Sequence, residues 1–274
     1  MADEPLPEGA GALPLRHAVA LGLLHGPAEL LPISSSGHIT LVPWLLRWPY
    51  AELDAELRKA FEVALHAGTA AALLIGLRDE VGDAARGLDR RRIELIVLSF
   101  APAGVLAFAL ERPIERRLGT PATIAAGLVL GSLAMALADM APQERSREEA
   151  DWRDALALGT GQAAALVPGI SRNGATLAAA RLRRFTREDA NALSRHVALP
   201  IIVAATVLKG GRLAKRGLPP RTRAAFAAGT LASFASTLGS TWLIRQVERD
   251  RSLAPYAAYR IGLAAVVARR LRRG

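Results

Sequence analysis

Residues 93–110 read IELIVLSFAPAGVLAFAL, a stretch in which Glu94 is the one charged residue. Residues 122–138 (ATIAAGLVLGSLAMALA) and 224–244 (AAFAAGTLASFASTLGSTWLI) carry no charged residue. A helix needs about 20 predominantly apolar residues to cross about 30 Å of hydrocarbon. An amphipathic helix of a soluble bundle would show a charged face every 3.6 residues, which these stretches lack. They predict an all-α integral membrane protein.

The composition supports this prediction. The chain has 274 residues, of which 51% are hydrophobic, and a mean hydropathy of +0.22 although 22% are charged. The net charge is +10, and arginines collect beside apolar segments, at 90–92, 181–184 and 269–273. Arginines in these places are typical of helices anchored to lipid headgroups, so we expect no nucleic-acid partner. Because the chain has no cysteine, disulfide and thiol chemistry are excluded.

Apolar segments are separated by polar or Pro/Gly-rich residues along the whole chain. They are residues 16–31, 39–46, 60–77, 93–110, 122–141, 154–167, 174–180, 190–208, 224–244 and 253–268. The stretches 16–46 and 154–180 are each broken in the middle, and irregular backbone at membrane depth must be buried in protein or line a wet cavity. We therefore expect these two to be re-entrant helical hairpins that enter and leave by the same face. The other six segments are predicted crossings.

The two broken stretches resemble each other when the chain is shifted by 137 residues. Ser34 then falls on Ser171 and Gly37 on Gly174, inside the two breaks. Each copy has one hairpin and three crossings, and an odd number of crossings turns the second copy upside down, giving an inverted repeat. The prediction is a disordered tail at residues 1–15 followed by one membrane domain at residues 16–274. This domain is built from two repeat halves, at residues 16–141 and 153–270.

Polar residues at membrane depth mark both breaks as a candidate site. The first reads HGPAELLPISSSGH over residues 25–38 and the second PGISRNGAT over residues 168–176. Ionisable side chains are costly within a membrane and usually serve function, which applies to His25, Glu29, His38 and Arg172. An arginine can bind phosphate oxygens with two hydrogen bonds, and serine hydroxyls supply donors or a nucleophile. The combination predicts an anion site, whereas any one of these residues alone could be structural.

The motifs Glu29–His38 and Pro168–Thr176 make the chain similar to the bacitracin-resistance family of undecaprenyl-diphosphate phosphatases. Phe61-Glu62, Leu199-Pro200 and Tyr259-Arg260 also fall where that family has comparable residues. The resemblance implies hydrolysis of undecaprenyl diphosphate to the monophosphate, which recycles the lipid carrier of cell-wall synthesis. It also implies a multi-pass protein of the bacterial cell membrane whose site opens to the extracytoplasmic face.

The resemblance also implies roles for single residues. Glu29 would bind a metal or act as general base, Ser35 would be the nucleophile unless water is, and His38 would be the acid–base partner. Arg172 would stabilise the transferring phosphoryl group, and these four catalytic residues should converge on one polar cavity. The implied phosphate-binding residues are Ser34, Ser36, Gly169, Ser171, Asn173 and Thr176. The implied cofactor is a divalent cation, Mg²⁺ first and Ca²⁺ or Mn²⁺ as alternatives, held by Glu29 and His25.

Two positions depart from the family pattern. Asn173 replaces a serine and can still donate to a phosphate oxygen. His25 replaces an acidic or amide residue, and imidazole suits softer metals than Mg²⁺, which prefers oxygen ligands. Reduced activity, a different metal preference and loss of activity are all compatible with His25.

The sequence leaves another class of function open. Inverted repeats also build transporters, so a flippase that binds a polyprenyl phosphate headgroup without cleaving it is the alternative. A membrane scaffold would leave the intramembrane charges unexplained. The membrane orientation, the lipid chain length and the oligomeric state stay open, and a homodimer is compatible with the sequence.

Overall fold

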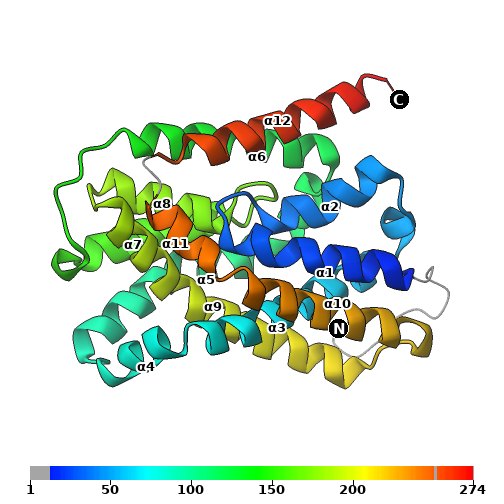
Figure 1. The fold of residues 1–274 in the computed structure, drawn as a ribbon, viewed down its shortest axis with the longest axis horizontal. Helices are drawn as coiled ribbons and strands as arrows, with labels where there is room; N and C mark the ends of the chain where they lie inside the picture. The colour runs from blue at the N-terminus through cyan, green and yellow to red at the C-terminus, as the bar shows by residue number, and fades with distance from the viewer. Residues whose placement is uncertain (1–12, 250–251, 274) are drawn as a thin grey trace. The chain divides into compact units, whose positions relative to one another are not determined.

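The computed structural model describes residues 13–249 and 252–273. Within these residues the regular elements are helices (Figure 1), which confirms the all-α prediction. Most of the predicted tail, residues 1–15, lies outside the described residues, and the first helix begins at Leu15.

The helices follow the predicted apolar segments closely. They are α1 (Leu15–Leu30), α2 (Ser35–Leu46), α3 (Ala55–Gly76), α4 (Arg78–Arg86), α5 (Arg90–Leu118), α6 (Pro121–Asp139), α7 (Trp152–Ala164), α8 (Arg172–Leu182), α9 (Arg187–Arg216), α10 (Pro220–Gly239), α11 (Trp242–Arg249) and α12 (Ala254–Leu271), with short 3-10 helices η1 (Pro49–Glu52) and η2 (Arg147–Glu149).

Local sequence signals explain several helix starts. The side chains of Asp89, Thr120 and Asp151 accept hydrogen bonds from backbone N–H groups at the starts of α5, α6 and α7. Such N-cap side chains satisfy donors that have no partner within the helix. Pro121 follows its cap directly, where the fixed backbone angle of proline suits the first helical residue.

Among the residues that the structure describes, four helices are long and apolar enough to cross a membrane. They are the helical stretches Ala55–Gly76, Arg90–Leu110, Pro121–Asp139 and Arg187–Gly211, all predicted crossings. The predicted crossing 224–244 is divided between α10 and α11, because α10 ends at Gly239. The boundary predicted for this segment was therefore wrong. Helix α12 covers the sixth predicted crossing but is not among these four helices.

Neither broken stretch is one unbroken helix. Helix α1 ends two residues before Pro32, and α2 begins at Ser35. Helix α7 ends at Ala164, α8 begins at Arg172, and the two helices pack against each other. Both stretches are therefore helix pairs, as predicted. Their entry and exit on one membrane face stays a prediction.

The chain forms two compact units that interleave along the sequence. Of the described residues, the first consists of 13–30, 38–79 and 199–241, and the second of 31–37, 80–198, 242–249 and 252–273. In the first unit, α1 packs against α10 and α10 against α3. Gly22 allows the close approach of α1, because a Cβ there would collide with the backbone carbonyl of Gly229 in α10. Small residues at such contacts are typical of membrane helices.

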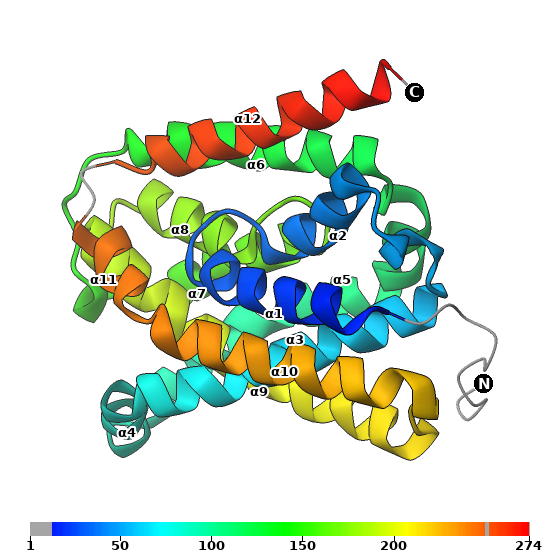
Figure 2. The same ribbon diagram turned by 45° about the vertical axis from the view of Figure 1, so that its right-hand side comes forward.

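In the second unit, α5 packs against α7, α8 against both α7 and α6, and α12 against α6. Figures 1 and 2 both show α12 lying along α6. In each unit the first helix of one repeat half packs against a helix of the other half. Helix α1 of the first repeat half packs against α10 of the second half, and α7 of the second half packs against α5 of the first. Reciprocal packing of the first helix of each half supports the internal repeat.

Several charged side chains at helix ends of the second unit are paired within the protein. Asp154 accepts from Arg145 at 2.8 Å and from Arg183 at 2.5 Å, and Asp139 accepts from Arg187 at 2.7 Å. The side chain of Arg181 is 1% exposed and lies 3.6 Å from Asp139. For Arg181 the headgroup-anchoring interpretation is wrong, because a buried guanidinium is stabilised by its ion pair and not by lipid.

Candidate active site

Ser34 and Ser171 make the same hydrogen bond in the two breaks, although Ser34 has a φ of 76° and Ser171 a φ of −64°. Ser34 Oγ accepts a hydrogen bond from the Gly37 backbone N–H at 3.3 Å, and Ser171 Oγ accepts one from the Gly174 N–H at 3.1 Å. Both serines directly precede a helix, α2 or α8, and residues 31–37 and 168–176 belong to the second unit. The start of a helix is a favourable place for an anion, because backbone N–H groups and the helix dipole point toward it.

A buried arginine connects the two breaks. Arg260 in α12 is 0% exposed and donates through Nη1 to the Pro32 carbonyl at 3.4 Å and through Nη2 to the Gly169 carbonyl at 3.1 Å. A Cβ at Gly131 of α6 would collide with Nη2, so glycine there makes room for the guanidinium. Arg260 therefore brings residues 31–37 and residues 168–174 together within the second unit.

The predicted phosphate-binding residues of the second break form a polar network. The Thr176 hydroxyl lies 2.5 Å from Ser194 Oγ in α9, and Ser194 Oγ donates to Asn173 Oδ1 at 3.1 Å. Thr176 and Ser171 are buried, whereas Arg172 and Asn173 are partly exposed. The network fixes the first turn of α8, from which the Arg172 side chain extends. In the first break, Ser34 is buried, Ser35 is partly exposed and Ser36 is exposed.

His25 of the first unit is held by hydroxyl groups. Its Nδ1 lies 2.8 Å from Thr69 Oγ1 in α3 and 3.3 Å from Ser233 Oγ in α10. Thr69 Oγ1 in turn lies 3.0 Å from Ser233 Oγ and 3.1 Å from Thr237 Oγ1. His25 is 0% exposed, so these contacts compensate for the loss of water around a polar ring.

Glu29 lies one helical turn after His25, as its spacing predicted. The Glu29 carboxylate is 6% exposed and lies 3.8 Å from Nε2 of His66 in α3. The rings of His25 and His66 meet edge to face at 4.6 Å between centroids. One ligand atom from each of His25, Glu29 and His66 lies within 4.8 Å of the others, which is close enough for one metal ion. His38, also buried, belongs to the first unit.

The predicted site residues are thus divided between the units. Residues 25, 29 and 38 belong to the first unit, and residues 34–36, 169, 171–173 and 176 belong to the second. Within the second unit, the structure brings the two breaks together at Arg260. Convergence of Glu29, His38, Ser35 and Arg172 on one cavity stays a prediction.

Sequence reasoning missed the functional potential of two residues. His66 is an ionisable residue inside the apolar segment 60–77, and that position alone was a usable signal. Arg260 was noted as similar to the family, and an arginine inside the predicted crossing 253–268 is the same kind of signal. The partner of each became visible only in the folded chain.

A separate charged cluster lies in the second unit. Glu80 of α4 accepts from Arg195 at 3.2 Å and lies 3.5 Å from His196 Nε2, while Arg195 also donates to Glu248 at 2.6 Å. The hydrogen bond with His196, together with the charge of Arg195, lowers the pKa of Glu80 to about 2 against the opposing effect of burial. This cluster contains none of the motif residues.

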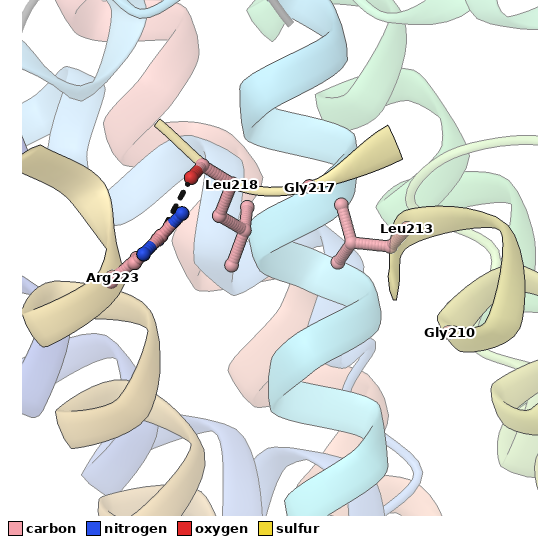
Figure 3. A pocket seen from close by; sticks show the side chains of 5 residues that line it. All are labelled: Gly210, Leu213, Gly217, Leu218 and Arg223. Atoms are coloured by element: carbon pink, nitrogen blue, oxygen red, sulfur yellow. Dashed lines mark hydrogen bonds between the residues drawn. The ribbon is translucent and has the colours of Figure 1, made fainter. Parts of the chain in front are cut away.

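The hollow in Figure 3 is not the candidate site. It has a volume of about 340 Å³ and is lined by Gly210, Leu213, Gly217, Leu218 and Arg223, where α9 connects to α10 in the first unit. The Arg223 Nε donates to the Leu218 carbonyl at 3.0 Å, as the dashed line shows. Among its described lining residues the cation is Arg223, which is bound to a backbone carbonyl, and such a lining does not fit a diphosphate group.

Comparison with known proteins agrees with the two motifs. The family described as "Bacitracin resistance protein BacA" matches residues 18–266. The chain is 40% identical to an undecaprenyl-diphosphatase of Geobacter sulfurreducens, over 90% of this chain and 94% of the relative. It is 36% identical to an undecaprenyl-diphosphatase of Chromohalobacter salexigens, over 92% of this chain and 97% of the relative. The chain therefore belongs to the bacitracin-resistance (BacA) family.

Proposed function

We propose that this chain is a membrane phosphatase that hydrolyses undecaprenyl diphosphate to undecaprenyl phosphate and inorganic phosphate. Family membership across residues 18–266 and the names of its relatives support this activity. The proposal rests mainly on one observation: Arg260 contacts both serine-capped breaks. The second of these breaks leads into the start of α8, where Arg172 lies. Four candidate spans support a multi-pass membrane location.

The second unit supplies the phosphate-binding groups in this proposal. Arg172 forms two hydrogen bonds to phosphoryl oxygens and balances the charge that develops on them. The starts of α2 and α8 favour the same anion through their dipoles. Ser34 and Ser171 hold these helix starts in shape as caps, while the Ser36 and Asn173 side chains donate to phosphate oxygens. Gly169 allows the backbone to come close to the phosphate, and Thr176 supports the first turn of α8.

The first unit supplies the basic groups. The Glu29 carboxylate binds the metal or acts as general base, and the His38 imidazole gives a proton to the leaving oxygen. A divalent cation bound by Glu29 and His25 would neutralise negative charge on the diphosphate and lower the pKa of bound water.

The reaction breaks the bond between the terminal phosphorus and the bridging oxygen. An oxygen nucleophile attacks the terminal phosphorus, its proton passes to the base, and the bridging oxygen leaves with the lipid monophosphate. If water attacks, phosphate forms in one step. If Ser35 attacks, a phosphoseryl intermediate forms and a water molecule then releases phosphate. Trapping of a phosphorylated Ser35 after rapid acid quenching would separate these two routes.

The test is phosphate release from undecaprenyl diphosphate by the purified full-length chain in lipid vesicles. We expect turnover with at least one divalent metal, and a loss of about 100-fold or more in Glu29→Gln, because an amide is a poor base. The matched control is Glu52→Gln, which changes an exposed glutamate of the same unit. If the wild type binds the lipid but is inactive with every divalent metal, the proposal fails and a headgroup-binding flippase replaces it.

The active site is proposed to open to the extracytoplasmic face. Vesicles of uniform orientation should then release phosphate to the side that corresponds to the cell exterior. Release only on the opposite side would contradict this orientation without affecting the proposed reaction.

A further inference from the structure

We infer that His25, Glu29 and His66 form a centre for a divalent transition metal of the Zn²⁺ class, and not for Mg²⁺ or Ca²⁺. One carboxylate and two imidazole side chains, all in the first unit, place their ligand atoms within 4.8 Å of one another. The inference deepens the proposed function, but metal binding can be measured without it.

The hydroxyl network determines which nitrogen of His25 carries the proton. Ser233 Oγ donates its one proton to the Leu65 carbonyl at 2.9 Å, because a carbonyl can only accept. The Thr69 hydroxyl must therefore donate to Ser233 in their 3.0 Å contact, and Thr237 must donate to Thr69. With the Thr69 proton used, His25 Nδ1 must be the donor in its 2.8 Å contact with Thr69. The lone pair of the His25 ring is then on Nε2.

His66 has the same tautomer for a simpler reason. Its Nδ1 lies 2.8 Å from the backbone carbonyl of Glu62, which can only accept a hydrogen bond. The lone pair is therefore on Nε2, which faces the Glu29 carboxylate at 3.8 Å. Metal-binding histidines commonly donate their second ring N–H to a carbonyl or hydroxyl in this way, which orients the ring and increases its basicity.

With both imidazoles neutral, the centre offers two nitrogen lone pairs and a carboxylate, a set that attracts a cation. Two histidines and one glutamate are a ligand set of catalytic Zn²⁺ sites, which keep a further position open. Mg²⁺ requires oxygen ligands in near-octahedral geometry, and Ca²⁺ takes six to eight oxygens. A set with two nitrogens does not fit either ion.

The ligand atoms lie within 4.8 Å of one another and would move closer around a bound metal ion. Tetrahedral Zn²⁺ with bonds of about 2.1 Å places its ligand atoms about 3.4 Å apart. The contact between Glu29 and His66 is already 3.8 Å. His25 and Glu29 are buried, whereas the His66 side chain is 34% exposed, so the partly open side of the centre is at His66. Thr69, Ser233 and Thr237 hold the opposite side.

The experiment measures metal binding by the purified full-length protein. Metal content after expression in medium with balanced metals should show about one Zn²⁺ per chain, and excess Mg²⁺ should not displace it. Replacement by Co²⁺ should give the visible absorption of a four-coordinate site. His66→Gln should weaken Zn²⁺ binding at least about 100-fold, since loss of even an outer partner costs 10–100-fold.

Two further variants keep the test independent of folding defects. His25→Glu retains a ligand at this position, so we expect it to bind metal but to compete better for Mg²⁺. His17→Gln is the matched control, because His17 is a buried histidine of α1 that stacks on Trp48 outside the cluster. It should retain the wild-type Zn²⁺ content.

The outcomes separate this inference from the proposed function. Equal Zn²⁺ binding by wild type and His66→Gln would overturn the centre, as would displacement of Zn²⁺ by equimolar Mg²⁺. A protonated His66 paired with Glu29 would then explain the cluster. If the chain hydrolyses the lipid with Mg²⁺ but binds no Zn²⁺, the proposed function is supported and the metal centre is not. If the chain binds Zn²⁺ but is inactive with every metal, the metal centre is supported and the proposed function is not.

Discussion

The two breaks of the chain share a scaffold and differ in chemistry. Ser34 and Ser171, which are 137 residues apart, cap the following helices with the same hydrogen bond to a glycine three residues later. The residue equivalent to Ser35 is Arg172, and the residue equivalent to His38 is Ala175. The first break therefore carries the proposed bases and nucleophile, and the second carries the proposed phosphate-binding cation. The two breaks share the serine-to-glycine hydrogen bond and differ in the proposed catalytic groups.

The helices before the breaks differ in a similar way. His25 corresponds to Gln162, and Glu29 corresponds to Leu166. Gln162 Nε2 donates to the Ser99 carbonyl of α5 at 3.0 Å, whereas His25 contacts the hydroxyl network of α3 and α10. Both helices use a polar residue at this position to bind a neighbouring helix. Only the first has a carboxylate one turn later, Glu29, which lies beside a second histidine, His66 of α3.

Arg172→Ala tests the part of the comparison with the largest expected effect. Loss of the guanidinium should lower kcat/KM for phosphate release about 1,000-fold or more, because arginines in phosphoryl transfer contribute on this scale. Arg172→Lys should recover part of the activity, since lysine keeps the charge but not the two-bond geometry. Full activity of the alanine variant would show that Arg172 of the second break takes no part in the hydrolysis.

His25→Glu tests how the metal ligand at position 25 of α1, together with Glu29, determines the metal preference. A carboxylate supplies the oxygen that Mg²⁺ prefers, so Mg²⁺-dependent hydrolysis should rise about 10-fold or more while Zn²⁺-dependent hydrolysis falls. Rates measured across a Mg²⁺, Mn²⁺, Ca²⁺ and Zn²⁺ series check this. An unchanged metal profile would mean that His25 does not bind the metal.

Replacing the caps tests their equivalence in folding. Ser34→Ala and Ser171→Ala should each lower the free energy of unfolding by about 1 kcal/mol, the usual cost of a lost N-cap. For a chain of this length that corresponds to a drop of about 2–4 °C in Tm. Thermal unfolding in detergent measures both variants. A much larger effect of one variant would show that the two turns are not equivalent.

The smallest expected effect concerns Glu80, which lies outside both breaks. Its pKa is about 2, below the ordinary 4.5, so its ion pairs stabilise the fold above pH 4.5 and lose that contribution as the pH falls toward 2. Because the side chain is one-third exposed, solvent screening limits the effect to about 0.5 kcal/mol. The stability difference between wild type and Glu80→Gln should shrink across this range. A constant difference would contradict the ion-pair explanation.

The sequence alone determined the fold class and the two breaks, and it predicts the repeat. Charge-free stretches require helices that cross a membrane, because an unpaired backbone is too costly in hydrocarbon. Pro32 predicted the end of α1, and the Ser–Gly match predicted that the two breaks resemble each other. Both breaks have the same serine-to-glycine hydrogen bond, while the φ angle of the serine differs. These are local signals, and local signals can be read from neighbouring residues.

Tertiary structure decided which distant residues meet. His66 joins His25 and Glu29 only because α3 packs against α1, and Arg260 reaches both breaks only because α12 packs against α6. The burial of Arg181 also depends on its tertiary partner Asp139. No spacing along the chain encodes such contacts, because they depend on how helices far apart in sequence pack together.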